Sequence, residues 1–177
     1  YIFYQRQVNV RRPIASVSKL MTALVAKKYI PSDAEITMTK KSLDVDGDAP
    51  IFYPNEKIKS EDLIKSMMII SSNKAAMALA NYLGQEKFVG LMNDTAKQLG
   101  MTQTTYVEPT GLSFLNQSSP NDLKKLTKYI ITEYPNLLLI AQNSEIKIQG
   151  KNPDVVHDLT NINQIAHHPQ FLTDLNI

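Results

Sequence analysis

The sequence predicts a single α+β domain, residues 1–177, in which a central cluster of helices packs on a sheet built from strand segments near both ends of the chain. Two observations predict this class. Apolar residues recur at helical spacing through most of residues 16–141, whereas residues 1–4, 36–39 and 144–149 alternate as strands do. The length of 177 residues also fits one domain with ample material for a core.

The first helix is predicted from about Ser16 to Tyr29, because Pro31 cannot continue a helix. Before it, the polar residues from Gln5 to Arg12 are expected to form a turn. The apolar residues of this stretch are numerous enough to bury the helix: Ile14, Leu20, Met21, Leu24 and Val25.

The bounds of the later elements are predicted from Pro, Gly and helix-capping residues. Residues 40–57 are rich in Asp, Gly and Pro and predict a loop with short strands, after which Ser60 is expected to cap a helix that ends near Ile70. The remaining expectations are a helix at 71–80, a helix from Glu86 to a Gly100 cap, a turn-rich loop at 102–112, a helix from Pro120 to Glu133 capped by Ser119, a short helix at 137–141, irregular chain at 152–170 and a strand beginning at 171–177.

Composition excludes several classes of protein. The apolar fraction of 43%, the charged fraction of 20% and the net charge of +2 are ordinary for a globular domain. The absence of cysteine excludes disulfides and thiol catalysis. No basic cluster with interleaved aromatics suggests nucleic acid, and no apolar run approaches the roughly 18 residues of a membrane-spanning helix.

The stretch at 13–26 carries the main candidate for chemistry. A serine hydroxyl needs a neighbouring base to become a nucleophile, and a lysine serves as that base only when it is largely neutral, as in a desolvated position. Residues three apart share a helix face, and an apolar helix provides desolvation. The spacing Ser-x-x-Lys, weak by itself, occurs three times: at Ser16 and Lys19, at Ser71 and Lys74, and at Ser144 and Lys147.

Context favours the first of these pairs. Ser16 and Lys19 open a strongly apolar helix, whereas Ser144 begins a stretch that alternates like an exposed strand. The segment Ser71-Ser72-Asn73 is unusual because polar residues separate two apolar helices, and buried polar groups are costly unless they are bonded. Helix capping by a serine is the alternative explanation for this segment.

Two other groups of residues are candidate ligand sites. The acidic residues Asp44, Asp46 and Asp48 lack the spacing and the closing glutamate of a calcium loop, so a solvated loop near a cleft is the favoured interpretation. The histidines lack metal-ligand spacing and are interpreted as surface residues: His157, His167 and His168.

The motifs together resemble the serine penicillin-binding proteins, specifically the D-alanyl-D-alanine carboxypeptidase and endopeptidase family. The stretch from Arg12 to Ala23 is similar to the family's nucleophile motif, and Ser71-Ser72-Asn73 is similar to its Ser-x-Asn motif. Glu108-Pro-Thr-Gly-Leu, with Asn116 and Asp122-Leu123 beyond it, is similar to the loop and helix that follow. Residues 100–112 favour the endopeptidase branch.

The resemblance implies a penicillin-binding/β-lactamase-like transpeptidase fold, with helices packed on an antiparallel sheet, and a serine D,D-peptidase that acts on peptidoglycan peptides. It implies that Ser16 is the acylated nucleophile, Lys19 the general base, Ser71 a proton relay and Asn73 a substrate-binding residue that also holds Lys19. The backbone N–H of Ser16 is expected to form one half of an oxyanion hole.

The same resemblance implies that no cofactor or metal is needed, that β-lactams act as covalent inhibitors, and that the protein is exported to the periplasm or cell envelope. One departure limits it. The family's third motif, Lys-Thr-Gly, does not occur in the sequence, although it is expected shortly after a segment such as Phe171–Ile177. The sheet is therefore expected to be incomplete in this chain, and the chain to be truncated at both ends.

Two alternative functions stay open. A class A β-lactamase needs a deacylating glutamate with Glu-x-x-Leu-Asn spacing, and Glu108 is followed by Pro-Thr-Gly-Leu without the asparagine. An inactive binding or scaffold domain of the same fold is the other alternative, because half of the oxyanion hole is missing from the sequence.

Overall fold

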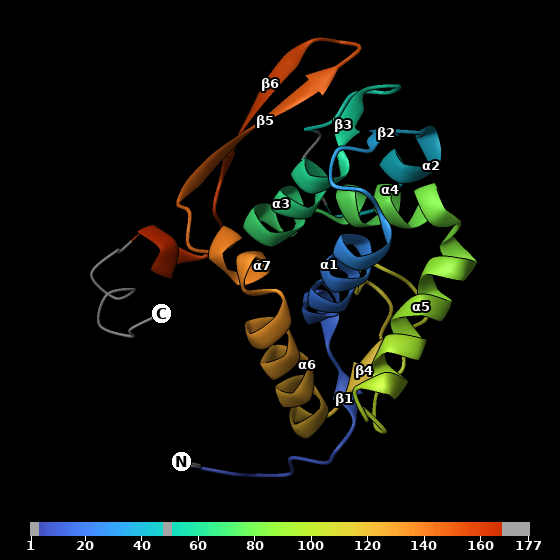
Figure 1. Cartoon of the computed structure of the whole chain (residues 1–177), viewed down its shortest axis with the longest axis vertical. Helices are drawn as coiled ribbons and strands as arrows, with labels where there is room; N and C mark the ends of the chain where they lie inside the picture. The colour runs from blue at the N-terminus through green and yellow to red at the C-terminus, as the bar shows by residue number, and fades with distance from the viewer. Residues whose placement is uncertain (1–3, 48–50, 168–177) are drawn as a thin grey trace.

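A computed structural model describes residues 4–47 and 51–167 of the chain. Within it the helices form one cluster, with α1 in the middle (Figure 1). Residues 1–3 of the strand expected at 1–4, the strand expected at 171–177 and the interpretation of His168 lie outside the described residues, and Tyr4 is not part of a strand. The α-helices are α1 (Ser18–Tyr29), α2 (Lys40–Leu43), α3 (Ser60–Ile70), α4 (Asn73–Leu83), α5 (Gln85–Gln98), α6 (Pro120–Glu133) and α7 (Pro135–Ile140).

An antiparallel sheet at one end of the helical cluster completes an α+β fold, which confirms the predicted class (Figure 1). Its strand order is β2-β3-β5-β6, and β5 and β6 form a long hairpin that extends away from the helices. A separate two-stranded ladder, β1 with β4, lies at the other end. The strands are β1 (Arg12–Pro13), β2 (Glu35–Thr37), β3 (Lys57–Lys59), β4 (Gln117–Ser118), β5 (Glu145–Lys151) and β6 (Val155–Thr160).

Helix α1 is the centre of the hydrophobic core. Most of its length is buried against α3, α4 and α5, and apolar side chains of the sheet close the core at one end. Burying each large aliphatic side chain contributes roughly 1.5–3 kcal/mol, so α1 is held in place by the packing of its buried residues. The fully buried apolar side chains include Met21, Leu24, Ile58, Leu63, Leu79, Phe88 and Leu126.

Several boundaries differ from the sequence prediction. A 3₁₀ turn, Ala15–Val17, precedes α1, so the α-helix begins at Ser18 rather than at Ser16. Ser60 is the first residue of α3 and does not cap it; Lys59 occupies the N-cap position without a side-chain bond. Ser119 caps α6 as predicted, by accepting a hydrogen bond from the backbone N–H of Asp122.

Two larger differences concern β6 and His157. Residues 155–160, predicted to be irregular, form β6 because they pair with β5 along six residues. The prediction that His157, on this strand, is a surface residue is wrong: its side chain is buried and its Nε2 lies 2.5 Å from Glu56 Oε1.

No helix among the described residues has the length and apolar character needed to cross a membrane.

Candidate active site

Ser16 and Lys19 lie within hydrogen-bonding distance of each other at the N-terminal end of α1. Lys19 Nζ donates to Ser16 Oγ over 3.0 Å. Ser16 is exposed, whereas Lys19 is only 3% exposed. This places an accessible hydroxyl against a desolvated amine, which is the arrangement that nucleophile activation requires.

The turn that carries Ser16 has a strained backbone, and a loop distant in the sequence packs against it. Ala15 has φ of +45°, a left-handed conformation that is costly for a residue with a Cβ. Gly111 packs directly on this turn: a Cβ at Gly111 would lie 2.0 Å from Ala15 O, and its own φ is +86°. Only glycine fits there, so the 108–116 loop fixes the backbone that presents the serine.

The same loop contacts Lys19. Its Nζ donates to the backbone carbonyl of Thr110 over 2.7 Å, and one turn further along α1 the Thr22 hydroxyl donates to the carbonyl of Pro109 over 2.6 Å. Two successive carbonyls of the loop are thereby bound to one helix. Thr110 and Gly111 were not among the predicted site residues, although the turn-rich Pro-Thr-Gly sequence did mark a loop.

Ser71 and Asn73 lie at the junction of α3 and α4, two helices that pack on α1. Ser71 is the C-cap residue of α3, and its φ of +57° is the left-handed conformation in which many helices end. Capping accounts for Ser72, whose hydroxyl accepts from the backbone N–H of Ala75, and for the backbone conformation of Ser71 at the end of α3, but it does not use the Ser71 hydroxyl. The side-chain amide of Asn73 donates to the carbonyl of Asp46 over 2.7 Å.

The structure therefore joins two of the four predicted residues directly, Ser16 and Lys19. It places Ser71 and Asn73 on neighbouring elements of the same core. The acidic loop contributes a backbone carbonyl to the site through Asp46, and Asp48 lies outside the described residues. Across residues 4–47 and 51–167, His, Asp and Glu side chains form no group of three that could hold a metal ion.

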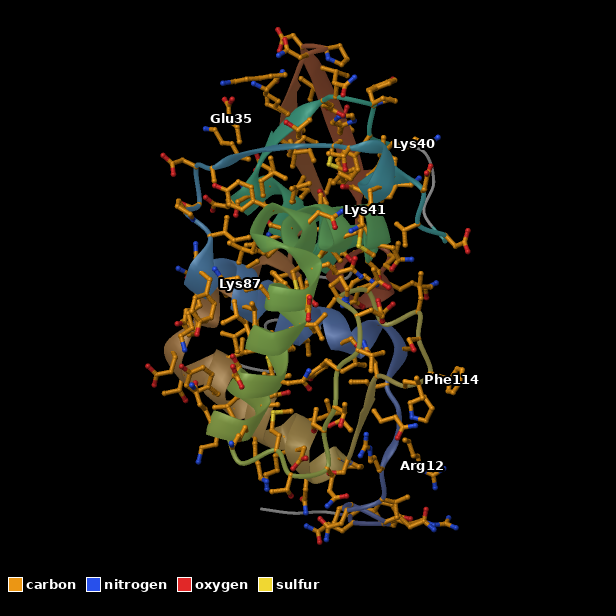
Figure 2. The ribbon with its side chains drawn as sticks, turned by 90° about the vertical axis from the view of Figure 1, so that its right-hand side faces the viewer. Arg12, Glu35, Lys40, Lys41, Lys87 and Phe114 are labelled. Carbon is orange, nitrogen blue, oxygen red and sulfur yellow. The ribbon has the colours of Figure 1, made fainter. Side chains whose placement is uncertain are left out.

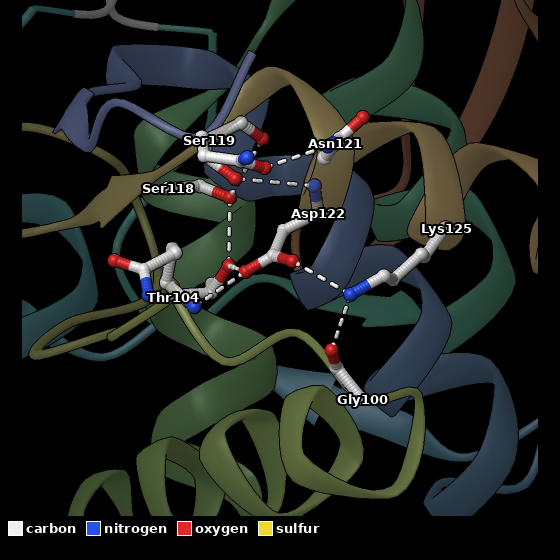
Figure 3. A network of polar contacts seen from close by, with 9 residues as sticks. Gly100, Thr104, Ser118, Ser119, Asn121, Asp122 and Lys125 are labelled. Carbon is white, nitrogen blue, oxygen red and sulfur yellow. Dashed lines mark hydrogen bonds and ion pairs between the residues drawn. The ribbon is translucent and has the colours of Figure 1, made fainter.

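A polar network anchors both ends of the 100–119 segment that contains the loop (Figure 3). The buried carboxylate of Asp122 accepts from the backbone N–H of Gln103 over 2.7 Å and from the Thr104 hydroxyl over 2.9 Å. Lys125 pairs with the same carboxylate and donates to Gly100 O. The loop between these anchors projects Phe114, 71% exposed, into solvent (Figure 2).

In a comparison with protein families, one family model matches nearly the whole chain. The model described as D-alanyl-D-alanine carboxypeptidase matches residues 1–174. This span includes every residue of the site described above.

Individual relatives carry related names. The chain is 32% identical over 170 residues to a D-alanyl-D-alanine endopeptidase of Escherichia coli strain K12, covering 94% of this chain and 54% of the relative. It is 40% identical over 126 residues to a D-alanyl-D-alanine endopeptidase of Haemophilus influenzae, covering 69% of this chain and 43% of the relative. The chain thus spans about half the length of the curated relatives it matches.

Solved structures share the fold. A D-alanyl-D-alanine carboxypeptidase, DacD, from Francisella tularensis superposes with a TM-score of 0.76 at 27% identity, covering 83% of this chain and 38% of that one. A mutant of the Streptomyces K15 DD-transpeptidase superposes with a TM-score of 0.83 at 22% identity, covering 92% and 70%. The second likeness supports the fold alone.

Proposed function

The chain belongs to the D-alanyl-D-alanine carboxypeptidase family of serine peptidases, and on this premise we propose that the protein carrying it hydrolyses D-alanyl peptide bonds of peptidoglycan through an acyl-enzyme on Ser16. One observation supports the proposal most strongly. The exposed hydroxyl of Ser16 lies 3.0 Å from the amine of Lys19, and that amine is buried.

In the proposed reaction Lys19 accepts the hydroxyl proton as Ser16 Oγ attacks the carbonyl carbon of the D-alanyl residue. The peptide C–N bond then breaks, and the departing amine takes a proton relayed by Ser71. Water hydrolyses the resulting ester, with the same groups moving the proton in the opposite direction, and Ser16 is restored. No step needs a cofactor.

Asn73 is assigned to the substrate's amide and to holding Lys19, and the backbone N–H of Ser16 to the oxyanion. The polar contact of Asn73 with Asp46 supports a role in shaping this edge of the site.

We place endopeptidase activity ahead of carboxypeptidase activity. The stretch at 100–112 favours that branch, and the Escherichia coli and Haemophilus influenzae relatives are named endopeptidases. With this substrate, the protein is expected in the bacterial cell envelope, on the periplasmic side, and β-lactams are its expected covalent inhibitors.

Covalent labelling with a fluorescent penicillin tests the proposal in the protein that carries this chain. Label should appear on the peptide that contains Ser16 and disappear in Ser16→Ala. Ser144→Ala, which alters the exposed serine of another Ser-x-x-Lys pattern, is the matched control and should label normally. Absence of labelling in the natural protein would favour the inactive scaffold domain instead.

Rapid turnover of penicillin would instead indicate a class A β-lactamase. That activity needs a glutamate able to activate water. The carboxylate of Glu108 accepts hydrogen bonds from its own loop, including the backbone N–H groups of Thr110 and Gly111 at 2.6 Å each, so its geometry favours a slow-hydrolysing acyl-enzyme.

A further inference from the structure

The carboxylate of Glu108 binds the backbone of the loop that follows it. Oε2 accepts from the backbone N–H of Thr110 over 2.6 Å and from its hydroxyl over 2.5 Å. Oε1 accepts from the backbone N–H of Gly111 over 2.6 Å and from that of Ser113 over 3.3 Å. Charge-assisted bonds of this kind are the stronger ones, so a single side chain sets the orientation of the peptide groups around Thr110.

One of those peptide groups faces the proposed base. The carbonyl of Thr110 and the N–H of Gly111 belong to the same planar trans peptide, so they point in opposite directions. Glu108 Oε1 holds the N–H, and Lys19 Nζ donates to the carbonyl over 2.7 Å. The carboxylate, the peptide and the amine form one hydrogen-bonded chain, in which each bond polarises the next.

Asn116 ties this arrangement to α1. It is fully buried, and its Nδ2 donates to Glu108 Oε1 over 2.9 Å, to Glu108 O over 2.9 Å and to the Ser18 hydroxyl over 3.1 Å. Its Oδ1 accepts from the backbone N–H of Val107 over 2.8 Å. The Glu108 carboxylate is therefore fixed relative to Ser18, the neighbour of Lys19 in α1.

We propose that Glu108 is a positioning residue for the acylation step: acting through the Thr110 carbonyl, it holds the amine of Lys19 against the hydroxyl of Ser16, and Asn116 holds Glu108. The inference rests on the proposed function. It assigns a role to the Glu108-Pro-Thr-Gly-Leu motif. Among the hydrogen bonds described, the Glu108 carboxylate does not contact Ser16 or Lys19, and the loop of this motif packs against the turn that carries Ser16.

Replacing the carboxylate by an amide should separate positioning from general stability. In Glu108→Gln, an NH₂ group faces N–H donors of the loop, so the Thr110–Gly111 peptide loses its orientation. A misplacement of about 1 Å can cost on the order of 100-fold in rate. We expect the acylation rate constant for a fluorescent penicillin to fall by about 100-fold while its noncovalent affinity stays unchanged.

The pH profile provides a second readout that a purely structural role would not move. A hydrogen bond to a carbonyl favours a charged ammonium over a neutral amine. Loss of the oriented Thr110 carbonyl should therefore move the pH of half-maximal acylation to a lower value. The matched control is Glu86→Gln, which makes the same change at an exposed position in the first turn of α5 and should leave both readouts unchanged.

If Glu108→Gln does not fold, Glu108→Asp replaces it, because the shorter carboxylate keeps the charge but cannot reach both peptide groups. The inference is overturned in either variant by an unchanged acylation rate, by a loss of affinity that accompanies the loss of rate, or by an unshifted pH profile. Those results leave the proposed function intact, provided that the natural protein is labelled at Ser16. If the natural protein is not labelled, the proposed function itself fails.

Discussion

Glu56 and His157 form a buried pair between the segment before β3 and strand β6, with Glu56 Oε1 2.5 Å from His157 Nε2. Glu56 is fully buried, and its other oxygen accepts from the backbone N–H of Tyr53 over 2.9 Å. The Phe52 ring meets the imidazole edge-on with ring centroids 5.5 Å apart. The pair therefore fastens the β5–β6 hairpin to the rest of the sheet.

Removing one partner of this pair should destabilise the fold. His157→Phe leaves the Glu56 carboxylate buried without its imidazole, and breaking a buried pair in this way costs about 3–5 kcal/mol. Urea unfolding measures the loss. The double variant Glu56→Leu with His157→Phe removes both polar groups and should recover a large part of it; a double variant no more stable than the single one would contradict the pair's importance.

Gly150 should tolerate no side chain, in contrast to Gly90. A Cβ at Gly150 would lie 1.7 Å from Glu56 Oε1, an atom already held by His157, so Gly150→Ala forces a shift that costs about 1–3 kcal/mol. Gly90, in the interior of α5, has open space around a Cβ. Gly90→Ala should instead stabilise by about 0.5–1 kcal/mol. Thermal unfolding of the two variants should shift in opposite directions.

Apart from α2, which lies in a stretch predicted to be a loop with short strands, the sequence predicted the helices because each had its own Pro, Gly or capping residues. Pro31, Ser119 and Pro120 set helix ends by local chemistry that needs no knowledge of the fold. Strand β6 and the burial of His157 could not be predicted, since both depend on β5 and on Glu56, which lies 101 residues away. The burial of a polar side chain on a strand depends on its hydrogen-bond partner, and a partner distant in the sequence is known only from the fold.

In the candidate site too, local relations could be predicted from the sequence and long-range contacts could not. The relation between Ser16 and Lys19 was predictable because it spans three residues of one segment. The contact from Lys19 to Thr110, 91 residues away, was not, because it uses a backbone carbonyl and carries no signature in residue type. The left-handed conformation of Ser71 was equally hidden, since serine has no preference for it.

Changing Lys19 to arginine should abolish most of the acylation. Arginine can still donate to Thr110 O, but it stays protonated and cannot accept the proton of Ser16. General-base catalysis contributes roughly 10²–10⁴-fold, so the acylation rate should fall by that factor. Lys147→Arg, at an exposed lysine paired with Asp158, is the control. A Lys19→Arg protein that acylates normally would remove Lys19 as the base.

Ser71 should show opposite effects on stability and on activity. Its left-handed backbone costs on the order of 1 kcal/mol for a residue with a Cβ, and glycine adopts this conformation without that strain. Ser71→Gly should therefore be more stable than Ser71→Ala, by about 1 kcal/mol in urea unfolding. Both variants lack the hydroxyl and should acylate slowly. Equal stability of the two would show that the backbone is not strained there.

Tyr106 should make the fold sensitive to alkali. Burial raises the pKa of its hydroxyl well above the usual range, and the nearby charge of Asp122 adds to the effect. The hydroxyl is buried and has no hydrogen-bond partner among the described residues. A folded-state pKa above the unfolded value means that the stability is fully present below the unfolded pKa of about 10 and is lost as the pH rises beyond it.

Replacing Tyr106 by phenylalanine should remove that sensitivity. Tyr106→Phe deletes an unpartnered buried hydroxyl, so at pH 7 we expect stability to be unchanged or higher by up to about 1 kcal/mol. Between roughly pH 10 and 12 the variant should lose less stability than the natural chain, since it has one fewer group to ionise on unfolding. Tyr82→Phe, at a tyrosine that is 48% exposed, should behave like the natural chain. Parallel loss of stability in Tyr106→Phe and the natural chain would place the alkaline sensitivity elsewhere.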